Sequence, residues 1–504
     1  MSFEPVYESI KAEERAAICS TQAVVETRLA VPDGTEVKKV LSVSAECYAA
    51  ATEVFAGEAR FSGTCSVLVV YEDKNGEKGT LSTDAEFSDR LTDERINGKI
   101  NPFLYAAVID TDASESTETE ICPSIVVEIT LVGSVEKQID YLASCAPGVY
   151  TKEEKTEYLK SVACAKKDLP VSVVTENSNI VKIFKCSASV AIRKVTALTD
   201  AALVEGDVMT RIIGANADGM LSEKTQKTEF SEEIDLADVR SGDIITCDAA
   251  VREVSARSIS EDNSVTVEAN VTLALCLCAF SYESTSVISD TFCMQKQTLL
   301  TRKNAEVCKN MDCLRFAETI SGNITLDIGN APAYSVLYFD AVKINIGGTF
   351  VQSGRLTVEG IVSGTVAYYS EDDRSDCSVN VEIPFSVTEN VSCGDDAKVF
   401  VTACVGNTSV RVRRANELGI KVEACFTAAI SDEKKCAFVA ELAEGDDMPK
   451  NTAAVSVHIA TAGEGLWDVA KKTGCSPDEI TAQNPALELP LKGGERILVY
   501  RNIE

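Results

Sequence analysis

The side chains that most often carry catalysis are scarce in this chain of 504 residues. His458 is its only histidine, so no Ser-His-Asp triad, Cys-His pair or histidine metal cluster can form around more than that one residue. No phosphate-binding glycine loop follows a strand-like run. Carboxylates are abundant, which leaves a two-carboxylate glycosidase open by counting, but such enzymes line their clefts with aromatic side chains and this chain has one tryptophan. We therefore expect a protein that is not an enzyme, with no metal and no cofactor, and we expect His458 to face solvent.

The nineteen cysteines are the other group that could react. Their odd number, the lack of CxxC pairs and the lack of an export signal argue against a disulfide framework. Cys276 and Cys278, two residues apart, are expected on the same face of a strand, but without a neighbouring histidine they make a poor metal site. Most of the others lie in strand-like runs, where a reduced thiol packs as a small apolar side chain. We expect reduced thiols, with intermolecular cross-linking in a protein shell as the alternative.

The formal net charge of −30 restricts the class of partner. Binding to nucleic acid needs Lys and Arg to displace counterions, so the charge argues against nucleic acid and equally against anionic membranes. It fits either ordinary solubility or docking to a basic protein surface. No apolar run reaches the roughly 20 residues that a membrane span needs, and the first residues carry early acids without an apolar core. We expect a cytoplasmic protein without direct membrane insertion.

The elements of the last fifty residues are the clearest in the chain. A short alternating strand at 457–459 leads to a glycine-rich turn and then to an amphipathic helix with Leu466 and Val469 at helical spacing. Ser476 followed by Pro477 and two acids has the form of a capped second helix, which Asn484 and its following proline end. A closing strand at 496–500 completes a strand–helix–helix–strand unit.

This segment resembles a LysM domain, whose usual pattern is Gly-Asp-Thr-Leu-Trp in the first turn and Asn-Pro after the second helix. Here Glu464 and Gly465 stand where the family has Asp and Thr, and Lys492 and Gly493 replace the usual Pro-Gly. The resemblance implies a small α/β (βααβ) domain whose two loops bind an N-acetylglucosamine chain or a protein partner. These loop residues are Gly463, Glu464, Gly465, Leu466, Asn484, Pro485, Ala486 and Leu487. We expect Trp467 to belong to the core rather than to a sugar platform.

The rest of the chain repeats on a long period. A Phe-Ser pair with an acid nearby occurs three times, at Phe87, Phe230 and Phe385, and a Val-Glu pair follows each at nearly constant distance. Those second anchors are Val127, Val267 and Val422. Alternating runs and turn residues at short intervals indicate antiparallel sheets. The sequence predicts a mainly β protein of three tandem antiparallel β-sandwich or barrel-like domains.

The repeats resemble SPOCS domains, loosely in each copy. The first copy carries Pro32-Asp33 and a Val-Lys-Lys-Val-Leu run at 37–41, the third carries Ile383-Pro-Phe-Ser386, and the second is degenerate, without a proline before its phenylalanine. We expect helix-prone character at 150–168 and a helix near 305–316, both within linkers, and a mobile tether before the last unit. The predicted ranges are 1–149, 180–290 and 336–440 for the three SPOCS-like domains, 150–179 and 291–335 for linkers, 441–454 for the tether and 455–504 for the LysM domain.

Several SPOCS units followed by one LysM are similar to the SipL-type spore envelope proteins. The resemblance implies a non-catalytic coat assembly protein, made in the mother cell and located at the forespore surface. Its LysM domain would contact a coat morphogenetic ATPase (SpoIVA-like) or other spore envelope proteins, while the β domains offer sheet edges for lateral association. The alternative is a peptidoglycan-binding protein whose LysM loops hold an N-acetylglucosamine polymer.

Overall fold

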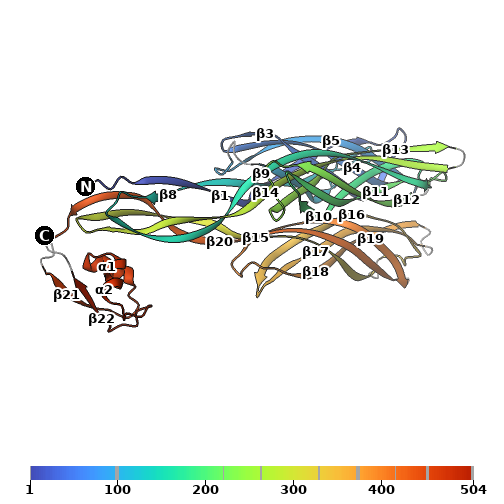
Figure 1. Cartoon of the computed structure of the whole chain (residues 1–504). Helices are drawn as coiled ribbons and strands as arrows, with labels where there is room; N and C mark the ends of the chain where they lie inside the picture. Colours follow the sequence, from blue (N-terminus) through green and yellow to red (C-terminus); the bar gives the residue numbers. More distant parts are fainter. Residues whose placement is uncertain are drawn as a thin grey trace.

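The computed structural model describes residues 2–96, 101–219, 221–261, 264–326, 330–370, 375–414, 416–449 and 453–500. It is an elongated, mostly β molecule (Figure 1). Short sheets gather at one end, paired long strands extend from them toward the amino terminus, and two small helices lie at the far end. No helix among the described residues is long and apolar enough to cross a membrane.

The described strands from β1 to β20 form three successive sets, which we call repeats 1, 2 and 3. Repeat 1 contains β1 (Val6–Glu26), β2 (Leu29–Ala30), β3 (Val37–Phe55), β4 (Glu58–Asp73), β5 (Lys78–Thr92), β6 (Phe103–Asp112), β7 (Glu120–Ile121) and β8 (Ser124–Ser144). Repeat 2 contains β9 (Val149–Ser178), β10 (Lys182–Ala197), β11 (Ala201–Ala215), β12 (Leu221–Asp235), β13 (Ile244–Glu261) and β14 (Ser264–Cys293). Repeat 3 contains β15 (Lys296–Thr325), β16 (Ser335–Gln352), β17 (Arg355–Ser370), β18 (Ser375–Asn390), β19 (Lys398–Arg414) and β20 (Glu417–Asp447).

All three repeats share one topology. Each has a three-stranded antiparallel meander, in the orders β3-β4-β5, β10-β11-β12 and β16-β17-β18. Each also has a second sheet in which the last strand lies between the first strand and a shorter one, in the orders β1-β8-β6, β9-β14-β13 and β15-β20-β19. The mainly β class predicted from the alternating runs is confirmed, and the same order of pairing in each set shows that the sequence repeat is a structural repeat.

A glycine–phenylalanine pair marks the same place in each meander. The pairs, directly opposite across the two last strands of the meander, are Gly63 with Phe87, Gly206 with Phe230 and Gly360 with Phe385. A Cβ on Gly360 would lie 2.2 Å from the carbonyl oxygen of Asn345 and 2.8 Å from the Phe385 ring. Only glycine leaves room for the ring to lie across the strand. The three phenylalanine anchors therefore occupy equivalent positions, as the sequence predicted.

The valine anchors also occupy equivalent positions, on the last strand of each repeat. Val127, Val267 and Val422 are all fully buried. Val127 and Val422 belong to the cores that join the two sheets of repeats 1 and 3. Burial of such a side chain is worth about 2 kcal/mol, so these positions hold the two layers together.

The first and last strands of each repeat run on beyond the sheets as a two-stranded ribbon, and the three ribbons pack together into what we call the stalk (Figure 1). Its core joins all three repeats through the buried side chains Ile10, Tyr141, Val287, Val307 and Phe438. The β9 and β15 strands that help to build it span the stretches for which we predicted helical character. Those helix predictions, at 150–168 and 305–316, are wrong, because both stretches are extended and pair along their length with β14 and β20.

A buried ion pair links the repeats where their sheets meet. Lys185 of repeat 2 donates to Asp340 of repeat 3 at 3.0 Å and to the Ser44 hydroxyl of repeat 1 at 3.2 Å. Both charged side chains are almost fully buried. Burial by itself raises the pKa of Asp340, but the Lys185 ammonium and the Ser44 hydroxyl outweigh it, so the pKa is lowered. Because one network uses all three repeats, they form one body, which we call the repeat body (residues 6–447).

Candidate functional site

The last described residues fold into a small βααβ unit, which we call the C-terminal unit. It contains β21 (Val455–Ile459), α1 (Leu466–Thr473), α2 (Pro477–Gln483) and β22 (Arg496–Tyr500), and its two strands pair antiparallel. Its core consists of the fully buried side chains Val469, Ala470, Ile480, Ile497 and Val499. The predicted order of elements is confirmed.

Local hydrogen bonds explain why the helices begin and end where the sequence predicted. The Ser476 hydroxyl accepts from the Glu479 N–H at 3.1 Å, and the Glu479 carboxylate accepts from the Ser476 N–H at 3.0 Å. Pro477 occupies the first turn, where no N–H is needed. The first helix ends at Gly474, whose φ of 64° is left-handed and favours glycine. The loops around the helices are therefore fixed by the chain's own side chains.

The first predicted loop is organised by Glu464. This buried carboxylate accepts from the Thr461 N–H at 2.9 Å, from Lys472 Nζ at 2.9 Å and from His458 Nε2 at 3.1 Å. The Lys472 ammonium, the Thr461 N–H and His458 together hold the pKa of Glu464 at about 2. The prediction that His458 faces solvent is wrong, because its side chain is only 21% exposed and is held against this carboxylate. Glu464 thus acts as a support of the loop rather than as an exposed binding group.

The second predicted loop is fixed by Asn484. Its amide donates to the carbonyl oxygens of Ile480 and Leu498 at 2.8 and 2.7 Å and accepts from the Leu498 N–H at 2.8 Å. These bonds tie the end of α2 to β22. Pro485 and Ala486 then stand exposed, and the Leu487 N–H closes the turn on the Asn484 carbonyl at 2.9 Å.

Of the eight predicted loop residues, some hold the loops in place from inside the unit and the others form its exposed surface. Leu466 and Leu487 come from different loops but pack, half-buried, on the same core. Glu464 and Asn484 are engaged inside the unit. The members left exposed are Gly463, Gly465, Pro485 and Ala486. Such a surface offers backbone groups and small apolar contacts to a ligand.

Neither loop shows the geometry of a catalyst or of a metal site. The polar groups of Glu464 and Asn484 are satisfied within the unit, and the exposed members carry no titratable side chain. In the part of the chain that the structure describes, no three His, Cys, Asp or Glu side chains come together to hold a metal ion.

The C-terminal unit rests on the end of the stalk through one face of α1. Trp467 Nε1 donates to Asp290 Oδ2 at 2.9 Å, and Lys471 Nζ donates to the same carboxylate at 2.9 Å. Arg302 on β15 donates to Asp290 as well, at 3.1 Å. Burial raises the pKa of Asp290, but the Trp467 N–H and the Lys471 ammonium overcome that effect and lower it. One carboxylate of repeat 2 therefore fastens the unit.

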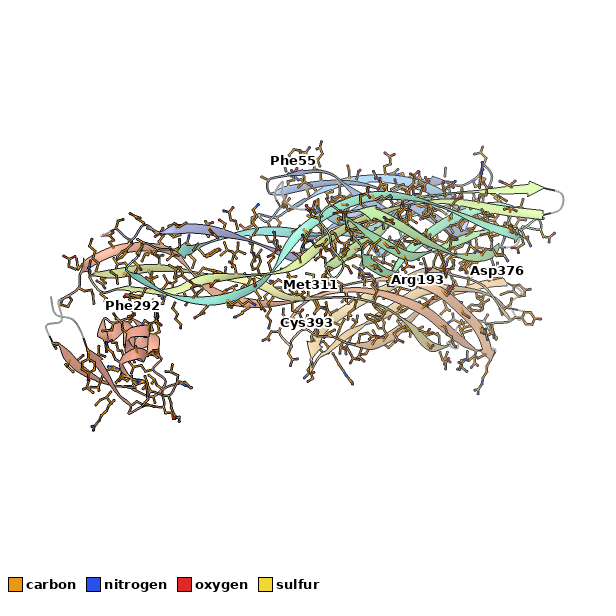
Figure 2. The ribbon with its side chains drawn as sticks, in the orientation of Figure 1. Phe55, Arg193, Phe292, Met311, Asp376 and Cys393 are labelled. Carbon is orange, nitrogen blue, oxygen red and sulfur yellow. The ribbon has the colours of Figure 1, made fainter. Side chains whose placement is uncertain are left out.

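An aromatic stack completes this contact, which we call the dock. Phe292, at the end of β14 next to α1 in Figure 2, meets the Trp467 ring edge-on with centroids 5.1 Å apart. The Phe292 ring also stacks on Tyr150 of β9, with ring centroids 4.9 Å apart. Trp467, predicted as a core residue, lies partly buried between the unit and the stalk. The dock escaped the sequence analysis because Tyr150, Asp290 and Phe292 carry no motif and are brought together only by the pairing of β9 with β14.

The tether expected at 441–454 is extended strand over its first part. Residues up to Asp447 belong to β20, and the Met448 N–H donates to the Gln295 carbonyl at 2.8 Å. The prediction of a mobile segment is wrong for these residues, and 450–452 lie outside the described residues. The route from the repeat body to the C-terminal unit is therefore short, and the dock fixes where the unit lies.

Comparison with known proteins identifies one part of the chain. No curated protein and no solved structure matches it. Residues 179–259 match the family model described as SipL, SPOCS domain. The matched segment covers β10 to β12 and most of β13 in repeat 2, the copy that the sequence indicated to be degenerate, and all three repeats share its topology. The match supports a SipL-type protein with a role in sporulation.

Proposed function

We propose that this chain is a non-catalytic assembly protein of the spore envelope, or coat, acting in the mother-cell cytoplasm at the forespore surface. The observation that carries the proposal is the SipL, SPOCS domain match within one of three repeats of the same topology. On this proposal all three repeats are SPOCS-like domains, and the C-terminal unit is a LysM domain. A repeat body with a separately folded unit docked at its end suits a scaffold.

The two loops of the C-terminal unit are the proposed contact with a coat morphogenetic ATPase (SpoIVA-like) or another envelope protein. They are supported by Glu464 and Asn484 and expose small residues, so a partner would meet a pre-formed surface at little ordering cost. The repeats would supply further weak contacts along their sheet edges. Several weak contacts on one rigid chain add up through effective concentration.

Glycan binding is the second function, and the exposed loop surface favours it. Gly463 and Gly465 in the first loop and Pro485 and Ala486 in the second leave backbone groups accessible to an N-acetylglucosamine polymer. The dock leaves these four residues exposed, so either ligand could bind without releasing the unit.

A fluorescent fusion in a sporulating host tests the spore proposal. We expect a ring around the forespore with the full chain, and dispersal of that ring when residues 455–504 are removed. Signal on vegetative cell walls, or no change linked to sporulation, would overturn the proposal and favour the glycan function.

A matched pair of variants tests the loops themselves. Ala486→Arg places a long charged side chain on the second loop, whereas Ala482→Arg places it on α2, at a position that is also exposed but lies outside both loops. We expect only Ala486→Arg to lose the forespore ring and the capture of the purified ATPase. Loss of binding to N-acetylglucosamine oligomers instead, with the ring kept, would assign the loops to glycan.

A further inference from the structure

A cavity of about 300 Å³ lies where the three repeats meet. Strands of all three line it: β3 and β6 of repeat 1, β10 and β13 of repeat 2, and β16 and β19 of repeat 3. Its wall includes four of the cysteines, which are Cys47, Cys247, Cys404 and Cys425. Cys404 and Cys425 are both reduced thiols in this structure.

Cysteines also lie directly opposite one another across strands, one such pair in each repeat. The pairs are Cys47 with Cys65, Cys164 with Cys278, and Cys404 with Cys425. Residues directly opposite in an antiparallel ladder have Cα atoms about 4.5 to 5.5 Å apart, and a disulfide needs about 4.4 to 6.8 Å. Each pair can therefore be bridged without moving the backbone far.

The pairs differ in their access to the cavity. Both Cys404 and Cys425 line it and are partly exposed. Of the repeat 1 pair only Cys47 lines it, and both of its thiols are buried. Neither Cys164 nor Cys278 lies on its wall, although their sulfur atoms are only 2.7 Å apart. The pair whose sulfur atoms are only 2.7 Å apart is therefore not the pair that lines the cavity. Cys404 and Cys425 face each other across the strands and both line the cavity.

The two thiols of this pair are also unequal. They share a hydrogen bond in which Cys404 supports the thiolate of Cys425. That bond lowers the pKa of Cys425, and the Lys227 ammonium adds to it, against burial and the Glu423 and Asp207 carboxylates, which raise the pKa. The pKa of Cys404 is raised, first by the same hydrogen bond and then by burial. Since the thiolate is the nucleophile, the direction of these two shifts favours Cys425 as the member that attacks first.

We propose that Cys404 and Cys425 form an oxidisable dithiol in the central cavity, with hydrogen peroxide as the oxidant. The Cys425 thiolate attacks one oxygen of the peroxide, the O–O bond breaks, and Cys425 becomes a sulfenic acid while hydroxide leaves. The Cys404 sulfur then attacks Cys425 Sγ, the S–O bond breaks, and the hydroxyl leaves as water with the Cys404 proton. Two thiols and one peroxide yield one disulfide and two waters, once hydroxide takes up the proton lost by Cys425.

Disulfide mapping of the full chain tests this assignment. The reduced protein is treated with hydrogen peroxide for increasing times, the remaining thiols are alkylated, and tryptic peptides are analysed without reduction. Arg411 and Lys421 lie between the two cysteines, so the bridge joins separate peptides. We expect the Cys404–Cys425 bridge to form about tenfold faster than the Cys164–Cys278 bridge. If the Cys164–Cys278 bridge forms first, or no Cys404–Cys425 bridge forms, the proposal is wrong.

Two serine variants test the order of reaction. In Cys404→Ser the sulfenic acid has no thiol to resolve it, so we expect dimedone to label Cys425. In Cys425→Ser the nucleophile is lost, and we expect labelling of Cys404 to be about tenfold weaker. Equal labelling of the two variants would overturn the assignment of Cys425 as the nucleophile. Cys164→Ser is the matched control and should leave the Cys404–Cys425 bridge unchanged.

Discussion

The repeat body and the C-terminal unit are held in their places by contacts of very different extent. The three repeats share a continuous stalk core and a buried Lys185–Asp340 pair. The C-terminal unit is attached through one aromatic stack and one carboxylate, Asp290. We expect the first arrangement to make the repeats unfold together, and the second to let the unit separate without unfolding either part. Each of the following changes tests that difference.

The largest expected effect comes from breaking the buried ion pair. Asp340→Ala removes the close partner of the buried Lys185 ammonium and leaves it the Ser44 hydroxyl and the more distant Glu46 carboxylate at 3.8 Å, which costs up to about 3–5 kcal/mol. Urea unfolding followed by far-ultraviolet circular dichroism should show one cooperative transition at a lower midpoint. The control is Asp376→Ala, which removes the half-exposed contact of Asp376 with Lys78 and should cost below about 1 kcal/mol. Equal effects would mean that the buried pair does not join the repeats.

Breaking the dock should release the C-terminal unit at a cost of about 2 kcal/mol or more, because a central aromatic contact is lost. In Phe292→Ala the ring of Trp467 loses its neighbour. Since Trp467 is the only tryptophan, its fluorescence should shift to the red and become easier to quench, while the circular dichroism of the repeat body stays unchanged. Phe350→Ala, at an exposed ring of β16, is the control. An unshifted spectrum in Phe292→Ala would show that the dock is not formed in solution.

A methyl group at a repeat anchor should cost about 1–3 kcal/mol through overpacking. Gly360→Ala places a Cβ against the Asn345 carbonyl and the Phe385 ring, whereas Gly348→Ala on the neighbouring strand meets nothing within 4 Å. Urea midpoints of the two variants should differ accordingly, and the tryptophan spectrum should remain that of the docked unit. If Gly348→Ala proves the more harmful, the anchor does not have the role assigned to it.

The smallest expected effect is the acid response of the first loop. The folded pKa of Glu464, at about 2, lies below its ordinary value of 4.5. Its contribution is therefore complete above about pH 4.5 and is lost as the pH falls toward 2. Thermal melting of the C-terminal unit, followed by Trp467 fluorescence, should show this decline.

Glu464→Gln should already be less stable at neutral pH and should lose less on acidification. Because the pKa of Asp290 is also lowered, acid weakens the dock in the same direction. Asp290→Asn separates the two effects, since it should keep the Glu464 response. A decline that vanishes in Asp290→Asn would assign the acid response to the dock instead.

The C-terminal unit and the repeat anchors could be predicted because their signals are local. Ser476 and Pro477 favour the start of a helix whatever the rest of the chain does. Phe87 and Val127 belong to short patterns that recur in each repeat. The first strands of repeats 2 and 3 could not be predicted as strands. Their exposed faces carry charged residues, as in the Lys152–Glu154 pair, and these hide the alternation of apolar and polar residues. Their pairing partners β14 and β20 also lie far along the chain.

The candidate site divides in the same way. The eight loop residues follow from the resemblance to LysM, and the roles of Glu464 and Asn484 as internal supports emerge only once β21, β22 and the helices are placed together. The dock depends on which stalk residues meet α1, and that is a matter of tertiary packing. Sequence patterns reflect interactions between residues that are near one another along the chain. Asp290 lies 177 residues from Trp467, so no such pattern indicates their contact.

The length of the β9–β14 ribbon has a geometric consequence. Beyond its pairing with β13, which ends at Phe280, β14 continues for the 13 residues 281–293, and a strand advances about 3.3 Å per residue, so the ribbon outside the sheet spans roughly 40 Å. With the C-terminal unit docked at one end of this ribbon and the sheets at the other, the length of the ribbon sets the distance between them. A partner bound by the loops and a partner in contact with the sheets would be held at a set separation. Lengthening or shortening the ribbon by matched residue pairs would change that separation in steps.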